Sequence, residues 1–396
     1  QFRPFRFLQV KRNNCNGTFK LSVSPPLNPV RLFLLRLFQF RRGETVLRLK
    51  RSSKGLVGVD ITSATVKLLE LEHRAGGLRI DSYAVRPLRE GAVVERRIRD
   101  KSEVVDTLGR AVDHARLQSR RAVVAVPNSA AITRTLSLPA SLSDEDIEAR
   151  IQMESDKYIP FPLNEVAFDF QRLGRHPRYD DQQEIMLVAC RLQDIDTLSS
   201  VLDAVGLETV AVDVEGFALE RVCRALQTSE DKEGDSTALV DIGANLCAFH
   251  VIKEGRIVYS RDNLCGGRQL TDAISKRYGM SFDEAGRAKK RGGLPDDYRQ
   301  QVLLPFIDTL IQHIGRSLQL YYTSAGQQQI RRLILAGGSS ALPGFAERLR
   351  AQSGLEATLA NPFTHMRIHP RLDVTALAAD APAMLTACGL AMRALP

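Results

Sequence analysis

The sequence has few cysteines, and their spacing excludes the common sites that cysteines build. Its six cysteines form no CxxC pair and follow no metal-ligand spacing. Cys190, Cys223 and Cys388 lie in apolar segments, as buried reduced thiols do. This usage predicts a cytoplasmic protein without a zinc site.

The short catalytic motifs that are easiest to recognise are also missing. The sequence contains no HExxH, no GxSxG and no GxxxxGK[ST], and its seven histidines are scattered. A zinc peptidase, a nucleophile-elbow hydrolase and a P-loop NTPase therefore have no support in the sequence.

An excess of positive charge is present, but not in the body of the chain. The formal net charge is +9, yet residues 1–54 hold 13 of the 55 Lys and Arg residues and one acid, Glu44. The remaining 42 basic and 45 acidic residues give −3. The body therefore offers no electrostatic argument for a nucleic-acid partner.

No hydrophobic run is long enough to span a bilayer. The longest candidate, residues 30–40, is interrupted by Arg31 and Arg36, whereas a spanning helix needs about 20 apolar residues. No small-residue cleavage site follows it, so it does not fit a signal peptide. We expect residues 1–54 to form a disordered basic leader; a segment lying on an anionic membrane is the alternative.

Strands alternate with helices in the rest of the chain, which predicts an α/β fold. The phrase LVGVDITSATVKLLEL at 56–71 returns in similar form as LVDIGANLCAFHVI at 239–252. Each phrase is a strand, an aspartate, a short turn and a second strand, so the chain is expected to contain two related halves. We also expect one helix over 141–159, opened by a Ser143/Asp146 capping box, and loops at 175–183 and 228–236.

The two hairpins carry the clearest chemistry in the sequence. Their turn residues are small, which lets backbone N–H groups approach an anion such as a phosphate. An aspartate at each tip, Asp60 and Asp241, can hold Mg²⁺ through its water molecules. Lys67 on the returning strand can reach a phosphate. The turns consist of Thr62, Ser63 and Ala64, and of Gly243, Ala244 and Asn245.

Two further glycine turns accompany the hairpins. Gly266 and Gly267 open an amphipathic helix, whose N-terminus adds positive potential near a ribose or phosphate. The phrase AGGSS at 336–340 is the other turn. A single hairpin of this kind is more often a capped β-turn, and a Gly-Gly loop can simply be a loop. Two hairpins together with the AGGSS turn favour a phosphate site.

Five phrases carry a resemblance to a known family. They are GVDITSATVKLLEL, MESDKYIPFPLNEVAFDFQ, VDVEGFALERV, LVDIGANLCAFHVIKEGRIVYSRD and LILAGGSSALPGF. From about residue 55 to the end, the chain resembles the actin-like nucleotide-binding superfamily of actin, FtsA, the heat-shock ATPases and the sugar kinases. Within it, the chain is most similar to the PilM family of type IV pilus assembly.

The resemblance implies a two-lobed actin-like ATPase fold with an FtsA-like subdomain inserted in the first lobe. The first lobe would comprise residues 55–236, with the insertion at about 129–182. The second lobe would comprise 237–362, and residues 363–396 would return to the first lobe.

The resemblance also implies ATP and Mg²⁺ in the cleft between the lobes. The metal would lie near Asp60 and Asp241, and Glu215 matches the position of a glutamate near the attacking water in heat-shock ATPases. The other implied nucleotide-binding residues are Thr62, Ser63, Ala64, Lys67, Gly243, Ala244, Asn245, Gly266, Gly267, Lys289, Gly337, Gly338 and Ser339.

Three positions depart from the pattern of the superfamily. Gly286 stands where a ribose-contacting glutamate is common, Cys247 where threonine is common, and Thr62 where glycine or serine is common. These departures argue against efficient hydrolysis more than against nucleotide binding. At most slow ATP hydrolysis is expected.

The implied partner is the short cytoplasmic N-terminus of the inner-membrane protein PilN. A disordered peptide gains affinity from preformed apolar pockets and strand edges. Tyr158, Ile159, Pro160 and Phe161 are candidates to shape such a groove, although a stiff turn packed in the core of the insertion is an equal reading. The protein would then lie at the inner membrane through its partner.

Two alternatives remain open from the residues. An FtsA-like cell-division ATPase would end in a basic amphipathic membrane helix, whereas APAMLTACGLAMRALP has one arginine and no basic face. A sugar-type kinase needs an aspartate base and a polar, aromatic substrate-binding insertion, which is not evident.

Overall fold

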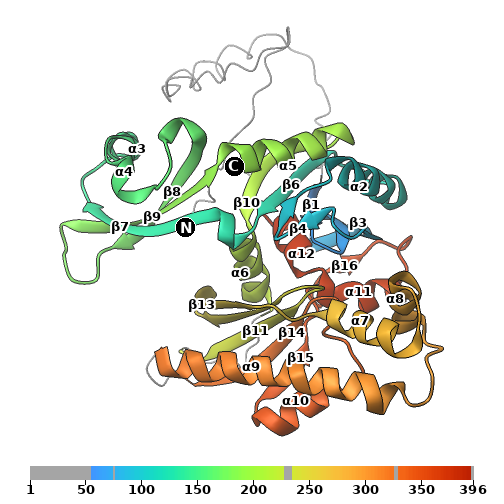
Figure 1. Ribbon diagram of the computed structural model, residues 1–396. Coiled ribbons are helices and arrows are strands. Elements are labelled where there is room, and N and C mark those ends of the chain that lie inside the picture. Colours follow the sequence, from blue (N-terminus) through green and yellow to red (C-terminus); the bar gives the residue numbers. More distant parts are fainter. Residues whose placement is uncertain (1–54, 75, 227–233, 325–328, 394–396) are drawn as a thin grey trace. The chain divides into compact units, whose positions relative to one another are not determined.

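The computed structural model describes residues 55–74, 76–226, 234–324 and 329–393 (Figure 1). The predicted leader at 1–54 and most of the predicted loop at 228–236 lie outside these residues. Within them, helices and strands alternate as the α/β prediction requires.

The first large sheet has six strands in the order β10-β6-β1-β2-β3-β16. β1, β2 and β3 are antiparallel neighbours, whereas β6 and β10 continue the sheet in parallel. The strands are β1 (Leu56–Ile61), β2 (Thr65–Arg74), β3 (Gly77–Pro87), β6 (Arg121–Val126), β10 (Glu208–Val214) and β16 (Arg367–Ile368).

The second large sheet repeats the same topology in the order β13-β12-β11-β14-β15. Its hairpin strands are antiparallel and the next two strands are parallel. The recurring phrase of the sequence thus forms the same unit twice. The strands are β11 (Ser236–Ile242), β12 (Cys247–Lys253), β13 (Arg256–Asn263), β14 (Ile330–Ala336) and β15 (Glu356–Leu359).

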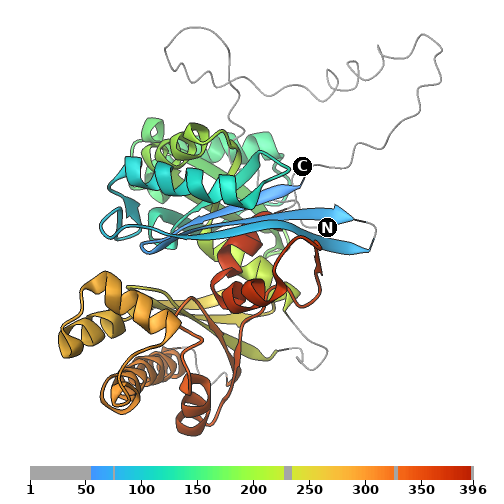
Figure 2. The ribbon, with the colours of Figure 1, turned by 90° about the vertical axis from the view of Figure 1, so that its right-hand side faces the viewer.

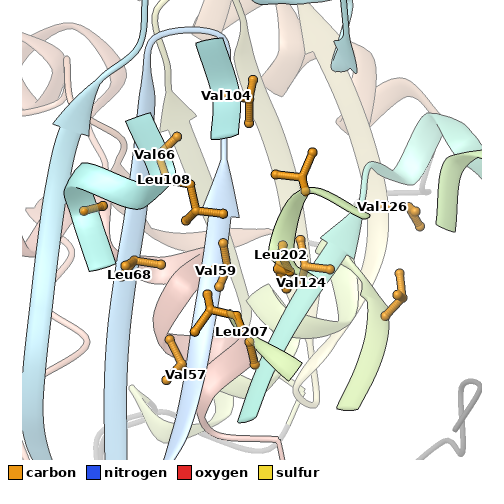
Figure 3. Packing of buried hydrophobic residues seen from close by; sticks show 14 of the residues in the cluster. Val57, Val59, Val66, Leu68, Val104, Leu108, Val124, Val126, Leu202 and Leu207 are labelled. Atoms are coloured by element: carbon orange, nitrogen blue, oxygen red, sulfur yellow. The ribbon is translucent and has the colours of Figure 1, made fainter. Parts of the chain in front are cut away.

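One face of the first sheet packs on α2 (Lys101–Ala115) and α5 (Leu192–Ala204). Side chains alternate along a strand, so Val57 and Val59 of β1 point to these helices together (Figure 3). Removal of this apolar surface from water stabilises the layer. Because Val57 and Val59 face the helices, Gly58 and Asp60 must face the other side of the sheet.

The second sheet is covered on one face by four helices (Figure 2). Ala238, Val240 and Ile242 of β11 point into this core. Asp241 therefore faces the opposite side of its sheet, as Asp60 does in the first. The helices are α7 (Gly267–Tyr278), α8 (Phe282–Arg291), α9 (Leu304–Ser324) and α10 (Phe345–Ser353).

Two helices, α6 (Glu215–Ala225) and α12 (Leu385–Ala391), pack on those faces of the two large sheets that the other helices leave uncovered. A short helix, α11 (Val374–Asp380), precedes α12. One buried cluster joins Leu69 of the first sheet, Leu239 of the second and Cys388 of α12. α12 lies very close to its neighbours: a Cβ at Gly58 would lie 2.0 Å from the Ala387 carbonyl oxygen.

A smaller antiparallel sheet, in the order β7-β9-β8, overlaps the predicted insertion at 129–182 and extends beyond it, because β9 ends at Arg191. Its elements are β7 (Ala131–Pro139), β8 (Val166–Arg175), β9 (Gln182–Arg191), α3 (Asp144–Met153) and α4 (Ser155–Tyr158). The Ser143/Asp146 capping box is confirmed. The single helix expected over 141–159 is wrong: Glu154, at φ −104° and ψ 17°, separates α3 from α4. β8 and β9 also extend into the predicted loop.

A two-stranded hairpin, β4 (Val93–Val94) and β5 (Arg97–Ile98), follows the first three strands. In the described part of the chain, no single helix is long and apolar enough to cross a membrane. One pair of helices, Val374–Ala383 and Leu385–Ala391, would together be long and apolar enough by length and composition alone, but the two helices are bent by 97° relative to each other.

Candidate functional site

The β1–β2 turn is held together by the Thr62 side chain. Thr62 Oγ1 donates to the Thr65 carbonyl at 2.9 Å and accepts from the Thr65 N–H at 3.1 Å. It also accepts from the Ala64 N–H at 3.4 Å. The turn is therefore preformed, because its own side chain fixes its backbone.

Asp60 and Lys67 are cross-strand neighbours beneath this turn. Lys67 Nζ donates to Asp60 Oδ2 at 2.8 Å, and both side chains are nearly buried. Burial lowers the pKa of Lys67, but Asp60 and then Asp241 outweigh this effect and raise it above its usual range. The lysine is therefore held on the aspartate as a fixed cation.

The β11–β12 turn meets the first turn directly. Gly243 N–H donates to the Leu246 carbonyl at 2.9 Å and closes the turn. Asn245 Nδ2 then donates to Ser63 Oγ at 3.0 Å, across 182 residues of sequence. The two hairpins that the sequence singles out thus contact each other through their tips.

Gly266 and Gly267 pack the start of α7 against the second turn. The N–H groups of Gly267 and Arg268 donate to the carbonyls of Gly243 and Ala244 at 3.0 and 2.9 Å. A Cβ at Gly266 would lie 2.4 Å from the Ala244 oxygen. These glycines therefore allow a close backbone contact, and the two amides already have partners within the chain.

The AGGSS turn packs on the second turn from another side. Ser339 N–H donates to the Ile242 carbonyl at 3.1 Å. Gly337 has φ +86°, and a Cβ there would lie 2.4 Å from Asp241 Oδ1. Gly338 faces open space, with nothing within 4 Å of a Cβ. The turn thus supports Asp241 and leaves room beside Gly338.

Lys289 of α8 lies beside these glycines. Its Nζ donates to the Gly267 carbonyl at 2.8 Å and to Thr271 Oγ1 at 2.6 Å. Burial, together with the neighbouring Lys290, lowers the pKa of Lys289 to about 8. Both hydrogen-bond acceptors of this ammonium are uncharged. A nearby anionic ligand would therefore stabilise the charged form of Lys289.

Glu215, the first residue of α6, lies in the same region. Burial raises the pKa of its carboxyl to about 7; Arg96 opposes the shift, and Asp60 and Asp241 add to it. Arg96 donates a hydrogen bond to this carboxylate. A carboxyl that titrates near neutrality can act as a general base.

Sequence reasoning missed two charged members of this region, Arg96 and Asp262. Both interact electrostatically with Glu215 and Asp241. Side chains alternate along β13, and Asn263 faces the core. Its neighbour Asp262 therefore points to the other face of the sheet. That alternation could have indicated Asp262, whereas nothing in the run ERRIR distinguishes Arg96 from Arg97 or Arg99.

The acidic residues fit a hydrated divalent cation. Among the described residues, no three His, Cys, Asp or Glu side chains group closely enough to hold a metal directly. Burial raises the pKa of Asp241; Lys67 opposes the shift and Asp60 adds to it. Carboxylates that repel one another are stabilised by a cation, and Mg²⁺ usually keeps several of its waters.

The four candidate partner-binding residues differ in their access to solvent. Ile159 is 2% exposed and belongs to the core of the small sheet, so it can shape a surface only from beneath. Tyr158 and Phe161 are partly exposed, and Pro160 is exposed. The Arg191 guanidinium stacks over the Phe161 ring at 4.1 Å.

Comparisons with known proteins match almost the whole described chain. The family model for type IV pilus assembly protein PilM matches residues 58–395. A solved structure described as the PilM-PilN type IV pilus biogenesis complex is 25% identical, with a TM-score of 0.70. The match covers 86% of this chain and 98% of that one.

The chain is also similar to ethanolamine utilization proteins, but less closely or over a shorter stretch. The solved ethanolamine utilization protein EutJ from Carboxydothermus hydrogenoformans is 17% identical, covers 85% of this chain and 89% of its own, and has a TM-score of 0.53. EutJ of Escherichia coli strain K12 is 29% identical over 153 residues, 39% of this chain. The chain spans only 48% of that relative's length. The expected α/β, actin-like fold is confirmed.

Proposed function

Because the chain belongs to the type IV pilus assembly protein PilM family, we propose that it is a cytoplasmic, ATP-binding scaffold of the inner-membrane pilus assembly platform. The observation that carries nucleotide binding is the contact of the two hairpin turns, Asn245 Nδ2 to Ser63 Oγ at 3.0 Å. This contact brings together the two turns, which carry Asp60 and Asp241, and the Lys67 ammonium that is bound to Asp60.

We propose that the turns bind the phosphates and that Asp60 and Asp241 hold Mg²⁺ through its waters. When bound, Mg²⁺ would neutralise phosphate charge. Lys67 would hold the Asp60 carboxylate in place. Gly337, Gly338 and Lys289 would line the adenosine side, and Glu215 would orient a water molecule. The three departures noted in the sequence favour binding over rapid hydrolysis.

The proposed division of the chain is that of two lobes with one insertion. We assign residues 55–236 to the first lobe, 129–182 to its insertion, 237–362 to the second lobe and 363–396 to the returning segment. The contacts of α12 with β1 and α6 support the last assignment.

We propose that the partner is the cytoplasmic N-terminal peptide of PilN, bound between the first lobe and the insertion. Tyr158, Pro160 and Phe161 would offer the accessible apolar surface, with Ile159 beneath it. Arg191, which already stacks on Phe161, would hold that ring in place. ATP would change the affinity for the peptide by closing the cleft between the lobes.

A titration of the full chain with a fluorescent PilN N-terminal peptide tests this function. We expect saturable binding that changes about fivefold or more when Mg·ATP is added. Phe161→Ala should weaken it about tenfold, because central aromatic contacts dominate peptide affinity. The control Val258→Ala, at an exposed position of β13, should bind as the wild type does.

Two outcomes of this titration would contradict the proposal. Absence of peptide binding would exclude the scaffold role. If Asp60→Ala abolished ATP binding and left the peptide affinity unchanged, the coupling between ATP and peptide would be wrong.

A further inference from the structure

The two residues at the tip of the β4–β5 hairpin adopt a backbone conformation that is unfavourable for their residue types. Glu95 and Arg96 have φ of 50° and 61°, the left-handed region that glycine and asparagine adopt most easily. Two-residue hairpin turns with both φ positive strongly prefer Asn-Gly or Asp-Gly. Backbone strain of this kind clusters at functional sites.

The guanidinium of Arg96 extends to the start of α6. It forms an ion pair with the Glu215 carboxylate. The N-terminus of α6 is fixed there, because Gly216 N–H donates to Asn128 Oδ1 at 2.8 Å. Arg96 therefore connects the hairpin to a rigidly placed carboxylate.

Arg96 also lies in the field of both phosphate-binding turns. Burial lowers its pKa, but the charges of Glu215, Asp262, Asp241 and Asp60 together raise the pKa above its usual range. The guanidinium therefore interacts electrostatically with the aspartates of both hairpins, and its direct contact is with Glu215.

Arg96 is better placed than Lys67 to change partner. The Lys67 side chain is 11% exposed and is held on Asp60. The Arg96 side chain is 28% exposed, and Glu215 is 19% exposed. A planar guanidinium can bind a phosphate through two parallel hydrogen bonds, as it binds a carboxylate.

We propose that Arg96 recognises the terminal phosphate of a nucleoside triphosphate and exchanges Glu215 for it. The protein would then distinguish ATP from ADP through this arginine, and Glu215 would be free when ATP is bound. The inference rests on the proposed nucleotide site and names the residue that reads the third phosphate.

Equilibrium binding of methylanthraniloyl-labelled ATP and ADP, with Mg²⁺, tests the inference. Arg96→Gly removes the guanidinium and suits the positive φ of the turn, although it leaves Glu215 without its ion-pair partner. We expect it to weaken ATP binding about tenfold or more and ADP binding less than about threefold. Glu95→Gly relaxes the same turn and Arg97→Ala removes a neighbouring charge; both should bind as the wild type does.

A second variant separates phosphate recognition from a structural role. Glu215→Gln weakens the competing partner, so ATP affinity should rise severalfold in the wild-type background and by a clearly smaller factor in the Arg96→Gly background, where only the loss of a nearby negative charge acts. An unchanged ratio of ATP to ADP affinity in Arg96→Gly would overturn the inference and leave the nucleotide site standing. A wild type that binds neither nucleotide would refute the proposed function as well.

Discussion

Replacing Gly58 by alanine is expected to lower the free energy of unfolding by about 3 kcal/mol or more. A Cβ at this position would lie 2.0 Å from the Ala387 carbonyl oxygen and 2.7 Å from the Ala391 nitrogen. Both atoms are backbone, so α12 would have to move away from β1. α12 cannot move freely, because a Cβ at Gly389 would lie equally close, 2.0 Å, to the Ala218 oxygen on α6.

Urea unfolding of the full chain measures this effect. Gly315→Ala in α9 is the matched control, because nothing lies within 4 Å of a Cβ there. In a helix this change should be neutral or stabilise by up to about 1 kcal/mol. A Gly58→Ala protein within about 1 kcal/mol of the wild type would show that α12 does not pack on β1 as described. Because β1 also carries Asp60, we expect Gly58→Ala to weaken nucleotide binding.

Lys67→Met is expected to cost about 3 to 5 kcal/mol of stability, since it leaves a buried carboxylate without its partner. Asp60 would lose the 2.8 Å contact and would repel Asp241 and Glu215. Added Mg²⁺ should restore part of the loss, because a cation can replace the missing charge. Urea unfolding with and without Mg²⁺ measures both effects.

The double variant Asp60→Leu/Lys67→Met provides the control for packing. Replacing both members of a buried pair by apolar side chains is often neutral, so this protein should regain much of the stability without Mg²⁺. It should also lose the stabilisation by Mg²⁺ at this position. If Lys67→Met had wild-type stability, or if Mg²⁺ had no larger effect on it than on the wild type, the charge balance described for the site would be wrong.

The elements around the two hairpins were predictable because their signals are local. Alternating apolar residues predict the strands, and the small residues after Asp60 and Asp241 predict the turns. The repeated phrase predicts the repeated topology. The helix over 141–159 was predicted wrongly, because its helical pattern runs through Glu154, where the backbone leaves helical geometry and separates α3 from α4.

The rest of the site depends on distant contacts that no local pattern records. Arg96 is one of three arginines in a short run, and a positive φ cannot be read from Glu-Arg. The N–H groups of Gly267 and Arg268 donate to carbonyls of another turn, so the sequence indicated close backbone approach without showing to what. Asn245 and Ser63 are 182 residues apart, and only the fold brings them together.

Calorimetric titration of Mg·ATP into the full chain tests most directly whether the two hairpins form one nucleotide site. The wild type should show a single saturable site. Asp60→Asn and Asp241→Asn, which keep the shape and remove one charge each, should each weaken binding about tenfold or more. Absence of binding in the wild type, or equal affinity in the wild type and both variants, would contradict the account.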